Sequence, residues 1–483
     1  MKFLSPVDAA FVRLETPRTP MNFGALLTFK LPDNAPRSYL LELFAYMKSK
    51  PVITPPFCYK LSQSRRTKLV PAWDEVVNLD IDYHMRHSSL PYPGGERELG
   101  VLVARLHSNN MDLTRPPWEC HLIEGLANNR FAIYIKAHHS AMDGVGALKV
   151  IKAWLSEDPR FANAPGPWAL PLPEQPASEE PHIRGFAQAL KATREHMRAA
   201  VELGKKLKSM NVKKDNPEGG LYSAMSTPRT LFNQPITQQR RLATQLFELS
   251  RLKALSAATG STINDLCLAI CGSAMRRYLL ELNALPEVPM IASVPIGLAR
   301  SDGKPGNAVA GFVVPLATEQ ADPLKRLKII NAVTTRTKQQ MLSMSFTALQ
   351  QFTLLGLSPL IFGQMTGLAN KMQPMFNVIV SNVVGSKHKL YLRGAELESM
   401  FPISVLFDGY ALNITIIGYS DRIAVGITGC RDAIPHVQRL AVYTGDALAE
   451  MERAVGIEPP APVPLKALAK AKAKTKLKVK TSS

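Results

Sequence analysis

Three features that the sequence lacks already narrow what the protein can be. Its five cysteines are an odd number without the spacing of a disulfide framework, which favours a reducing compartment. No run reaches the ~18 apolar residues that a membrane span needs. Pro6 and Asp8 follow the first residues too closely for the apolar core of a signal peptide. We therefore expect a cytoplasmic protein whose membrane contact is peripheral.

The net charge of +19 is concentrated in two segments. Residues 182–214 hold nine Lys and Arg against two Glu, and residues 464–483 hold seven Lys and no acidic residue, so each contributes +7 and the remainder +5. Both segments have little of the aromatic interleaving found in single-strand binders, and we expect no nucleic-acid partner. Such basic segments instead suit an anionic surface, that of the inner membrane or of lipid droplets.

A length of 483 residues predicts more than one domain. Seven prolines between residues 157 and 181 indicate an exposed linker, and residues 184–210 show the apolar stripe of a basic amphipathic helix. That helix either packs on a domain as a crossover or contacts a membrane. We predict four regions: an N-terminal domain (1–156), a linker and crossover helix (157–230), a C-terminal domain (231–455) and a Lys-rich disordered tail (456–483).

The most informative stretch reads as a strand, a turn and a helix. Residues 131–137 are mostly β-branched or aromatic, His138 and His139 follow, and helical spacing resumes after Asp143 and Gly144. Imidazole titrates near neutrality, so a histidine held at such a corner can take a proton from a hydroxyl. A purely hydrogen-bonding His pair is the simpler alternative. A metal site is disfavoured, because vicinal histidines point to opposite sides and no Cys or Glu follows at ligand spacing.

The pattern His-His-x-x-x-Asp-Gly resembles the active-site motif of the acyltransferase superfamily that includes chloramphenicol acetyltransferase, peptide-synthetase condensation domains and bacterial wax ester synthase/diacylglycerol acyltransferases. Further segments narrow the resemblance to the last family, with Pro117, Val384 and Ser386 departing from its usual pattern. These segments are the opening residues 4–11 and 19–24, the Arg-Pro-Pro-Trp-Glu run at 115–119, Asn264-Asp265, and Ser-Asn-Val-Val-Gly-Ser at 381–386.

The resemblance implies an α/β fold of two chloramphenicol-acetyltransferase-like domains, each a mixed β-sheet flanked by helices, with the active site at their interface. It implies transfer of a fatty acyl group from acyl-CoA, as co-substrate, to a long-chain alcohol or a diacylglycerol. No metal or other cofactor is expected. The expected catalytic residues are His139, His138, Asp143 and Asn264. His139 is the expected general base, Asp143 is expected to secure the turn, and Asn264 is a candidate donor that binds the oxyanion or positions the substrate. The expected substrate-binding residues are Gly144, Trp118, Asp265, Ser381, Asn382 and Gly385.

Other interpretations of these segments stay open. Thr262 and Asp265 fit a capping box, so Asn264 and Asp265 are also explained by helix initiation. Residues 339–370 carry no charged side chain and predict core helices broken at Pro359 and the glycines, or else an acyl-chain tunnel or a membrane-facing surface. A condensation-type acyltransferase using carrier-bound acyl groups and a noncatalytic lipid-droplet-binding protein are the competing functions. The sequence has no Gly-x-Ser-x-Gly elbow, which favours direct transfer without an acyl-enzyme.

Alternation and helical spacing also predict the main regular elements. The expected strands lie at 22–30, 131–137, 241–248, 291–295, 312–315, 376–384 and 411–417, and the expected helices at 38–49, 99–109, 435–454 and from 250.

Overall fold

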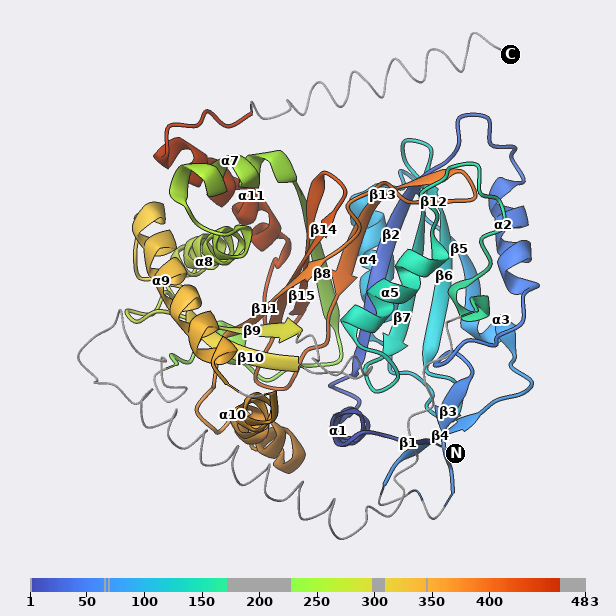
Figure 1. Cartoon of the computed structure of the whole chain (residues 1–483), viewed down its shortest axis with the longest axis horizontal. Helices are drawn as coiled ribbons and strands as arrows, with labels where there is room; N and C mark the ends of the chain where they lie inside the picture. The colour runs from blue at the N-terminus through green and yellow to red at the C-terminus, as the bar shows by residue number, and fades with distance from the viewer. Residues whose placement is uncertain are drawn as a thin grey trace.

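A computed structural model describes residues 2–64, 67, 70–171, 227–297, 309–344 and 346–460. Within these ranges the chain forms two halves, each built on a six-stranded mixed sheet, with a small three-stranded sheet beside the first (Figure 1). The basic helix expected at 184–210 and the tail from 464 lie outside the described residues.

The sheet of the first half has the order β12-β13-β2-β7-β6-β5, and only its β5–β6 pair is parallel. Helices α2, α4 and α5 pack around its core. The strands are β2 (Asn22–Lys30), β5 (Met85–Ser89), β6 (Trp118–Leu126), β7 (Arg130–His138), β12 (Tyr391–Leu392) and β13 (Ala395–Ile403). The helices are α2 (Tyr39–Lys48), α3 (Ile81–His84), α4 (Glu96–Ser108), α5 (Gly144–Trp154) and η2 (Pro167–Ala169).

The sheet of the second half has the order β10-β9-β11-β14-β15-β8. Helices α7, α8, α9 and α11 lie on the side of this sheet that faces away from the first half (Figure 1). The strands are β8 (Arg240–Glu248), β9 (Ile291–Gly297), β10 (Val309–Pro315), β11 (Val378–Val384), β14 (Leu412–Tyr419) and β15 (Arg422–Cys430). The helices are η4 (Leu231–Asn233), α7 (Leu249–Thr259), α8 (Ile263–Glu281), α9 (Pro323–Leu342), α10 (Phe346–Thr366) and α11 (Gln438–Ala454).

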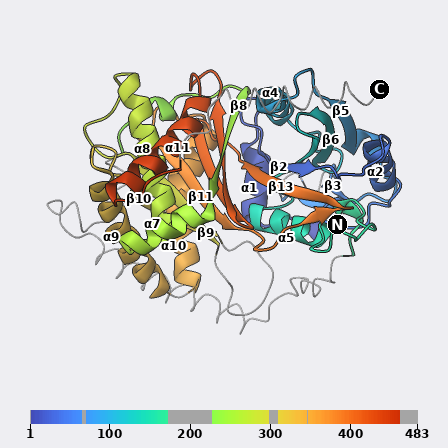
Figure 2. The ribbon, with the colours of Figure 1, turned by 90° about the horizontal axis from the view of Figure 1, so that it is seen from above.

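Strand β13 joins the two halves. It comes late in the sequence, yet it pairs with β2 along almost its whole length, from Glu396 opposite Lys30 to Ile403 opposite Gly24. Seen from above, it reaches across to lie beside β2 (Figure 2). Residues 391–403, which lie in the range predicted for the C-terminal domain, therefore complete the sheet of the N-terminal half.

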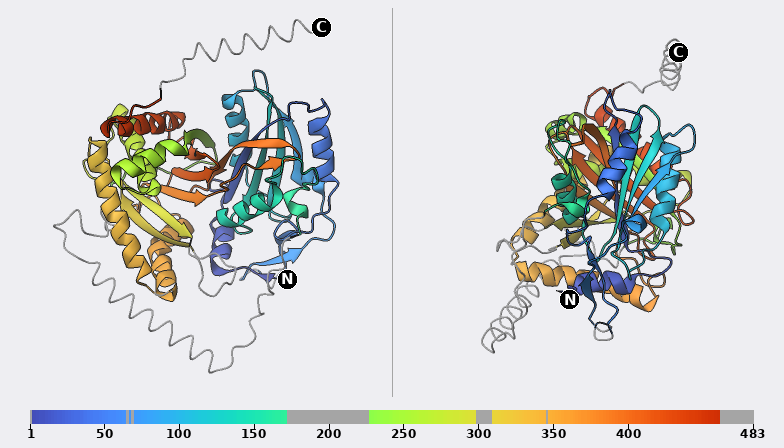
Figure 3. Two further views of the ribbon diagram at one scale, coloured as in Figure 1. Left: turned by 45° about the horizontal axis from the view of Figure 1, so that its top comes forward. Right: turned by 90° about the vertical axis from the view of Figure 1, so that its right-hand side faces the viewer.

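A second contact between the halves lies at the start of the chain. Helix α1 (Pro6–Leu14) packs against α10, as the side view also shows (Figure 3). Strand β1 (Lys2–Phe3) pairs with β4 (Ala72–Glu75), which pairs in turn with β3 (Tyr59–Leu61). The segment between α1 and β2 thus lies between the two halves. It contacts the end of β7, because the His139 N–H donates to the Met21 carbonyl.

Local sequence chemistry explains most element boundaries. Each strand expected from alternation is present, and Thr262 begins α8 with a capping box in which its hydroxyl accepts from the Asp265 N–H. Within the described ranges no single helix is long and apolar enough to cross a membrane, and α7 with α8 meets the criterion only as a pair bent by 101°.

The expectation for residues 339–370 needs correction. Helix α10 runs through Pro359 without a break, although a proline inside a helix lacks one backbone donor. Leu349 and Leu360 are buried, but Phe362 and Met365 are 56% and 64% exposed. Among the side chains described in this helix, some therefore belong to the core, whereas the last turns expose apolar ones.

Candidate active site

His139 lies in the turn between β7 and α5, and two aromatic rings fix the plane of its imidazole. Its ring stacks on Phe11 of α1, with centroids 4.2 Å apart and planes 17° apart, and meets Phe23 of β2 edge-on at 5.3 Å. Its backbone N–H donates to the Met21 carbonyl at 2.8 Å. Protein atoms surround most of the imidazole, but part of the residue's surface remains accessible. A molecule that reaches the turn can therefore contact this imidazole.

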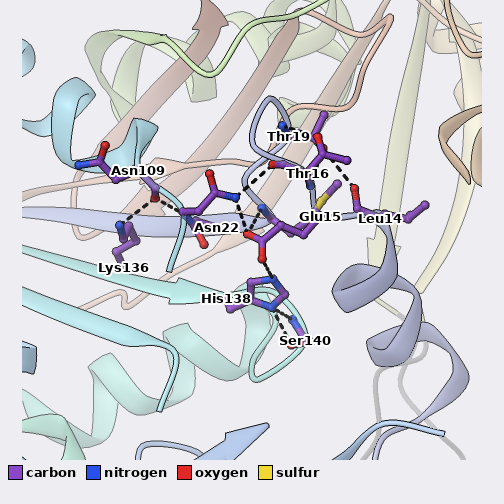
Figure 4. A network of polar contacts seen from close by, with 11 residues as sticks. Leu14, Glu15, Thr16, Thr19, Asn22, Asn109, Lys136, His138 and Ser140 are labelled. Atoms are coloured by element: carbon purple, nitrogen blue, oxygen red, sulfur yellow. Dashed lines mark hydrogen bonds and ion pairs between the residues drawn. The ribbon is translucent and has the colours of Figure 1, made fainter. Parts of the chain in front are cut away.

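His138, the last residue of β7, is fully buried. Its Nδ1 accepts from the Ser140 backbone N–H at 3.2 Å and lies 2.6 Å from the Ser140 hydroxyl (Figure 4). Because Nδ1 is an acceptor, the ring proton of the neutral form is assigned to Nε2, which lies 3.6 Å from Glu15 Oε2. The two adjacent histidines thus have opposite surroundings, as expected of neighbours at a strand end.

Asp143 begins helix α5. Its Oδ1 accepts from the Gly146 N–H at 2.6 Å, which is an N-cap bond. The carboxylate is partly exposed. Its negative charge favours the protonated imidazole and so raises the pKa of His139. Gly144 is exposed, and a Cβ placed on it would meet nothing within 4 Å among the described residues. Helix capping therefore explains Asp143, whereas close packing does not explain the glycine at 144.

The electrostatics of the turn keep His139 neutral. Burial is the largest influence and lowers the pKa of His139 from 6.5 to about 4, while its own backbone and Asp143 oppose the shift and His138 adds to it. At neutral pH the imidazole is thus unprotonated and able to accept a proton. A hydroxyl is the natural donor for such a group.

Trp118 begins β6 beside the same turn. Its indole N–H donates to the Phe57 carbonyl at 2.8 Å, and its ring stacks on Trp168 with centroids 5.0 Å apart. It is buried and borders a small apolar hollow against the turn. The lining residues of this hollow are Pro56, Phe57, Pro117, Trp118, Ala137, Ala141 and Met142. The hollow holds no more than about one water molecule, so packing accounts for Trp118 and its substrate-binding role stays a prediction.

The turn also lies where the two halves of the molecule meet. Met21, whose carbonyl holds the His139 backbone, is fully buried in a cluster with Leu14 and Val405, and Phe11 and Phe407 pack against that cluster. Val405 and Phe407 follow β13 in the second half of the chain. Both halves therefore contribute to the wall behind the imidazole.

Asn264 and Asp265 begin α8, and the two side chains have different surroundings. The Asn264 Oδ1 accepts from Asn382 Nδ2 at 3.4 Å, which joins α8 to β11. The Asp265 carboxylate is 1% exposed and accepts from Thr262, from Asn331 at 3.0 Å and from Thr334 at 2.7 Å. Helix initiation and the α8–α9 contact account for Asp265. Within the described residues no hydrogen bond joins Asn264 to His138 or His139.

The remaining motif residues lie on or next to β11. Ser381 and Asn382 are partly exposed, and Gly385 is buried just beyond the strand end. A Cβ on Gly385 would lie 2.1 Å from the Gly418 carbonyl oxygen of β14. Close backbone packing therefore requires glycine at this position.

Comparison with known proteins agrees with this geometry. A family model described as the wax ester synthase/diacylglycerol acyltransferase catalytic domain matches residues 4–267, and one described as the WS/DGAT C-terminal domain matches residues 305–452. The chain belongs to the wax ester synthase/diacylglycerol acyltransferase family. This confirms the family predicted from the sequence, and the protein is an acyltransferase.

Individual relatives of this WS/DGAT protein cover nearly its whole length. A Mycobacterium tuberculosis (strain ATCC 25618 / H37Rv) protein named as a diacylglycerol O-acyltransferase is 45% identical over 454 residues, which are 94% of this chain and 99% of the relative. The solved wax ester synthase/diacylglycerol acyltransferase of Marinobacter aquaeolei VT8 is 35% identical, with a TM-score of 0.74 over 94% of this chain and all of that one. The predicted two-domain α/β fold class is thus confirmed.

A more distant likeness shows the fold alone. The first condensation domain of the calcium-dependent antibiotic synthetase has a TM-score of 0.60 at 15% identity, covering 94% of this chain and 96% of that one. The WS/DGAT relatives are 35–45% identical to this chain, so the comparisons favour a WS/DGAT enzyme over a condensation-type acyltransferase.

Three site residues were missed in the sequence. Phe11 and Phe23 hold the His139 ring, and Glu15 faces His138. The signal available was position, since Phe11 and Phe23 lie inside the two opening segments that resemble the family and Glu15 lies between them. Nothing in their spacing shows that these segments lie against a turn that comes much later in the chain.

Proposed function

We propose that this protein transfers a fatty acyl group from acyl-CoA to a long-chain alcohol, giving a wax ester, or to a diacylglycerol, giving triacylglycerol. The observation that carries the proposal is the neutral, partly exposed imidazole of His139, held between Phe11 and Phe23 where the two halves meet. The relatives from Mycobacterium tuberculosis and Marinobacter aquaeolei are named for this substrate class, which supports the proposal.

In the proposed mechanism His139 is the general base. It takes the hydroxyl proton as the alcohol oxygen attacks the thioester carbonyl carbon, and a tetrahedral oxyanion forms. When this intermediate collapses, the C–S bond breaks and the imidazolium returns the proton to the departing thiolate, giving free CoA thiol and the ester. The nearby Asp143 carboxylate favours the imidazolium electrostatically.

Other residues have supporting roles in this proposal. Asn264 is the candidate oxyanion donor, because its Oδ1 accepts from Asn382 and no contact among the described residues uses its amide N–H groups. Trp118, which lies beside the turn among apolar side chains, is the candidate apolar contact for a substrate. Acyl-CoA is the co-substrate, and the proposal includes no metal or further cofactor.

We also propose that the protein works in the cytoplasm, at the inner membrane or on lipid droplets. The two basic segments of the sequence, which suit an anionic surface, support this location. The exposed Phe362 and Met365 at the end of α10 add apolar side chains that such a surface could accept.

One assay tests the activity. Purified protein is given palmitoyl-CoA with hexadecanol or with a diacylglycerol, and free thiol release and ester formation are followed. We expect both. No turnover with either acceptor would favour the noncatalytic lipid-binding alternative, and turnover only with carrier-bound acyl groups would favour the condensation-type one.

The same assay tests the base. His139→Ala should lose about 10²–10⁴-fold in turnover with little change in melting temperature, since the partly exposed ring is not a core anchor. His138→Ala should lose less turnover, because its ring points into the protein. Equal loss in both variants at unchanged melting would contradict the assigned roles.

A further inference from the structure

We propose that Glu15 is a positioning residue for the reaction, holding the His138-His139 turn from two sides at once. Glu15 is the residue after α1, and its side chain is only 11% exposed. Its carboxylate points at the turn from the chain segment that precedes β2 (Figure 4). The inference rests on the proposed role of His139 as base.

The first contact acts through the His138 ring. Glu15 Oε2 lies 3.6 Å from His138 Nε2, an ion-pair distance rather than that of a hydrogen bond. Nε2 is buried and has no hydrogen-bond partner within the described residues, so this carboxylate is the group that compensates the ring N–H. The other ring nitrogen is held by Ser140. The His138 ring is thereby fixed in one tautomer and one orientation.

The second contact acts through the backbone. Glu15 Oε1 accepts from the Met21 N–H at 3.3 Å and from Asn110 Nδ2 at 3.1 Å. The carbonyl of the same Met21 accepts the His139 backbone N–H at 2.8 Å. One carboxylate therefore anchors the residue that holds the base in place, and ties it to the segment after α4.

Through these two contacts Glu15 fixes the residues on either side of His139, the proposed base, without itself contacting the His139 ring. A base is effective only when its imidazole is held in line with the hydroxyl, and small displacements of a positioned group cost rate rather than binding. Losing the carboxylate charge should therefore lower kcat and leave the KM for acyl-CoA unchanged.

The test uses full-length Glu15→Gln, which keeps the size but replaces one acceptor oxygen by an amide donor, so that an N–H faces either His138 or the Met21 and Asn110 donors. We expect kcat to fall about tenfold, with unchanged KM. The matched control is Glu124→Gln, because Glu124 lies 3.4 Å from His87 on the far β5–β6 edge of the same sheet. The control should keep wild-type kcat.

Two further measurements separate positioning from a general loss of stability. In a His138→Ala background, Glu15→Gln should cost less than in the wild type, since one of its two routes is already gone. Histidine-selective ¹⁵N NMR should show His138 protonated at Nε2 in the wild type and altered in Glu15→Gln. If Glu15→Gln does not fold, Glu15→Asp, which keeps the charge, takes its place with a smaller kcat loss.

The outcomes distinguish this inference from the proposed mechanism. Wild-type kcat in Glu15→Gln, while His139→Ala is inactive, would overturn the positioning role alone. Full additivity with His138→Ala would overturn the contact through the His138 ring. Activity retained in His139→Ala would overturn the base assignment, whereas the NMR result for His138 would still test the Glu15 contact.

Discussion

His138 and His139 are neighbours in sequence, but one is fully buried and the other is partly exposed between two aromatic rings. Strand geometry alone predicts that their side chains point to opposite sides. It does not predict which of them faces solvent, because that depends on Phe11 and Glu15, which reach the turn from the chain segment that precedes β2. Asp143 as a helix cap was open to sequence reasoning, since capping depends on local spacing.

The pKa of His139 gives a test at the level of one residue. The shift from 6.5 to about 4 predicts that kcat/KM of the free enzyme is flat from pH 8 to about pH 6, with the acid limb well below 6.5. Because the folded pKa is lower than the unfolded one, His139 contributes stability that is complete above 6.5 and lost as pH falls toward 4. Melting at each pH separates unfolding from titration. An acid limb centred at 6.5 in folded enzyme would refute the shift.

Asn264 and Asp265 are adjacent and should respond differently to mutation. Asn264→Ser should lower turnover well beyond any change in melting temperature if its amide donates to substrate or oxyanion. Asp265→Ala should instead lower stability, by about 1–2 kcal/mol for the lost cap and more for the buried partners Asn331 and Thr334. Thermal unfolding and thiol release on both variants decide the matter. Normal turnover in Asn264→Ser would leave Asn264 with the helix-start role only.

Gly385 shows how a motif residue acts at the level of an element. Its backbone lies against Gly418, so Gly385→Ala must push the end of β11 away from β14 and should cost about 1–3 kcal/mol of unfolding free energy. Gly100 in α4 is the matched control, because a Cβ there meets nothing within 4 Å. Gly100→Ala should gain roughly 0.5–1 kcal/mol, the usual helix preference. Urea unfolding of both variants measures this, and equal stability of Gly385→Ala and wild type would contradict it.

Elements were predictable from sequence where local chemistry decides them. Strand β7 and the start of α8 follow from apolar pattern and capping. Strand β13 was not predicted, since its place beside β2 depends on pairing between distant parts of the chain. Helix α10 was expected to break at Pro359, but a single missing backbone donor does not outweigh the packing of Leu349 and Leu360 on either side.

At the scale of the whole molecule, each half of the chain contributes elements to the structure of the other. Strand β13 belongs to the second half of the sequence and to the sheet of the first, and α1 lies against α10. The cluster of Leu14, Met21 and Val405 behind the candidate active site combines both halves. A family resemblance implied this interface, whereas composition and periodicity could indicate only that the chain exceeds one domain.

The uneven charge distribution predicts that the C-terminal tail helps the protein to bind anionic membranes. Of the +19, residues 464–483 carry +7 in seven Lys without an acidic residue. Basic side chains near an anionic membrane contribute roughly 1 kcal/mol each. A protein ending at Glu458 should therefore bind anionic vesicles more weakly than the full chain, and turnover of soluble short-chain substrates should stay nearly unchanged. Vesicle flotation at low and high salt compares the two, with neutral vesicles as control. Because salt screens such attraction, identical and salt-independent flotation of the two proteins would exclude an electrostatic anchor in the tail.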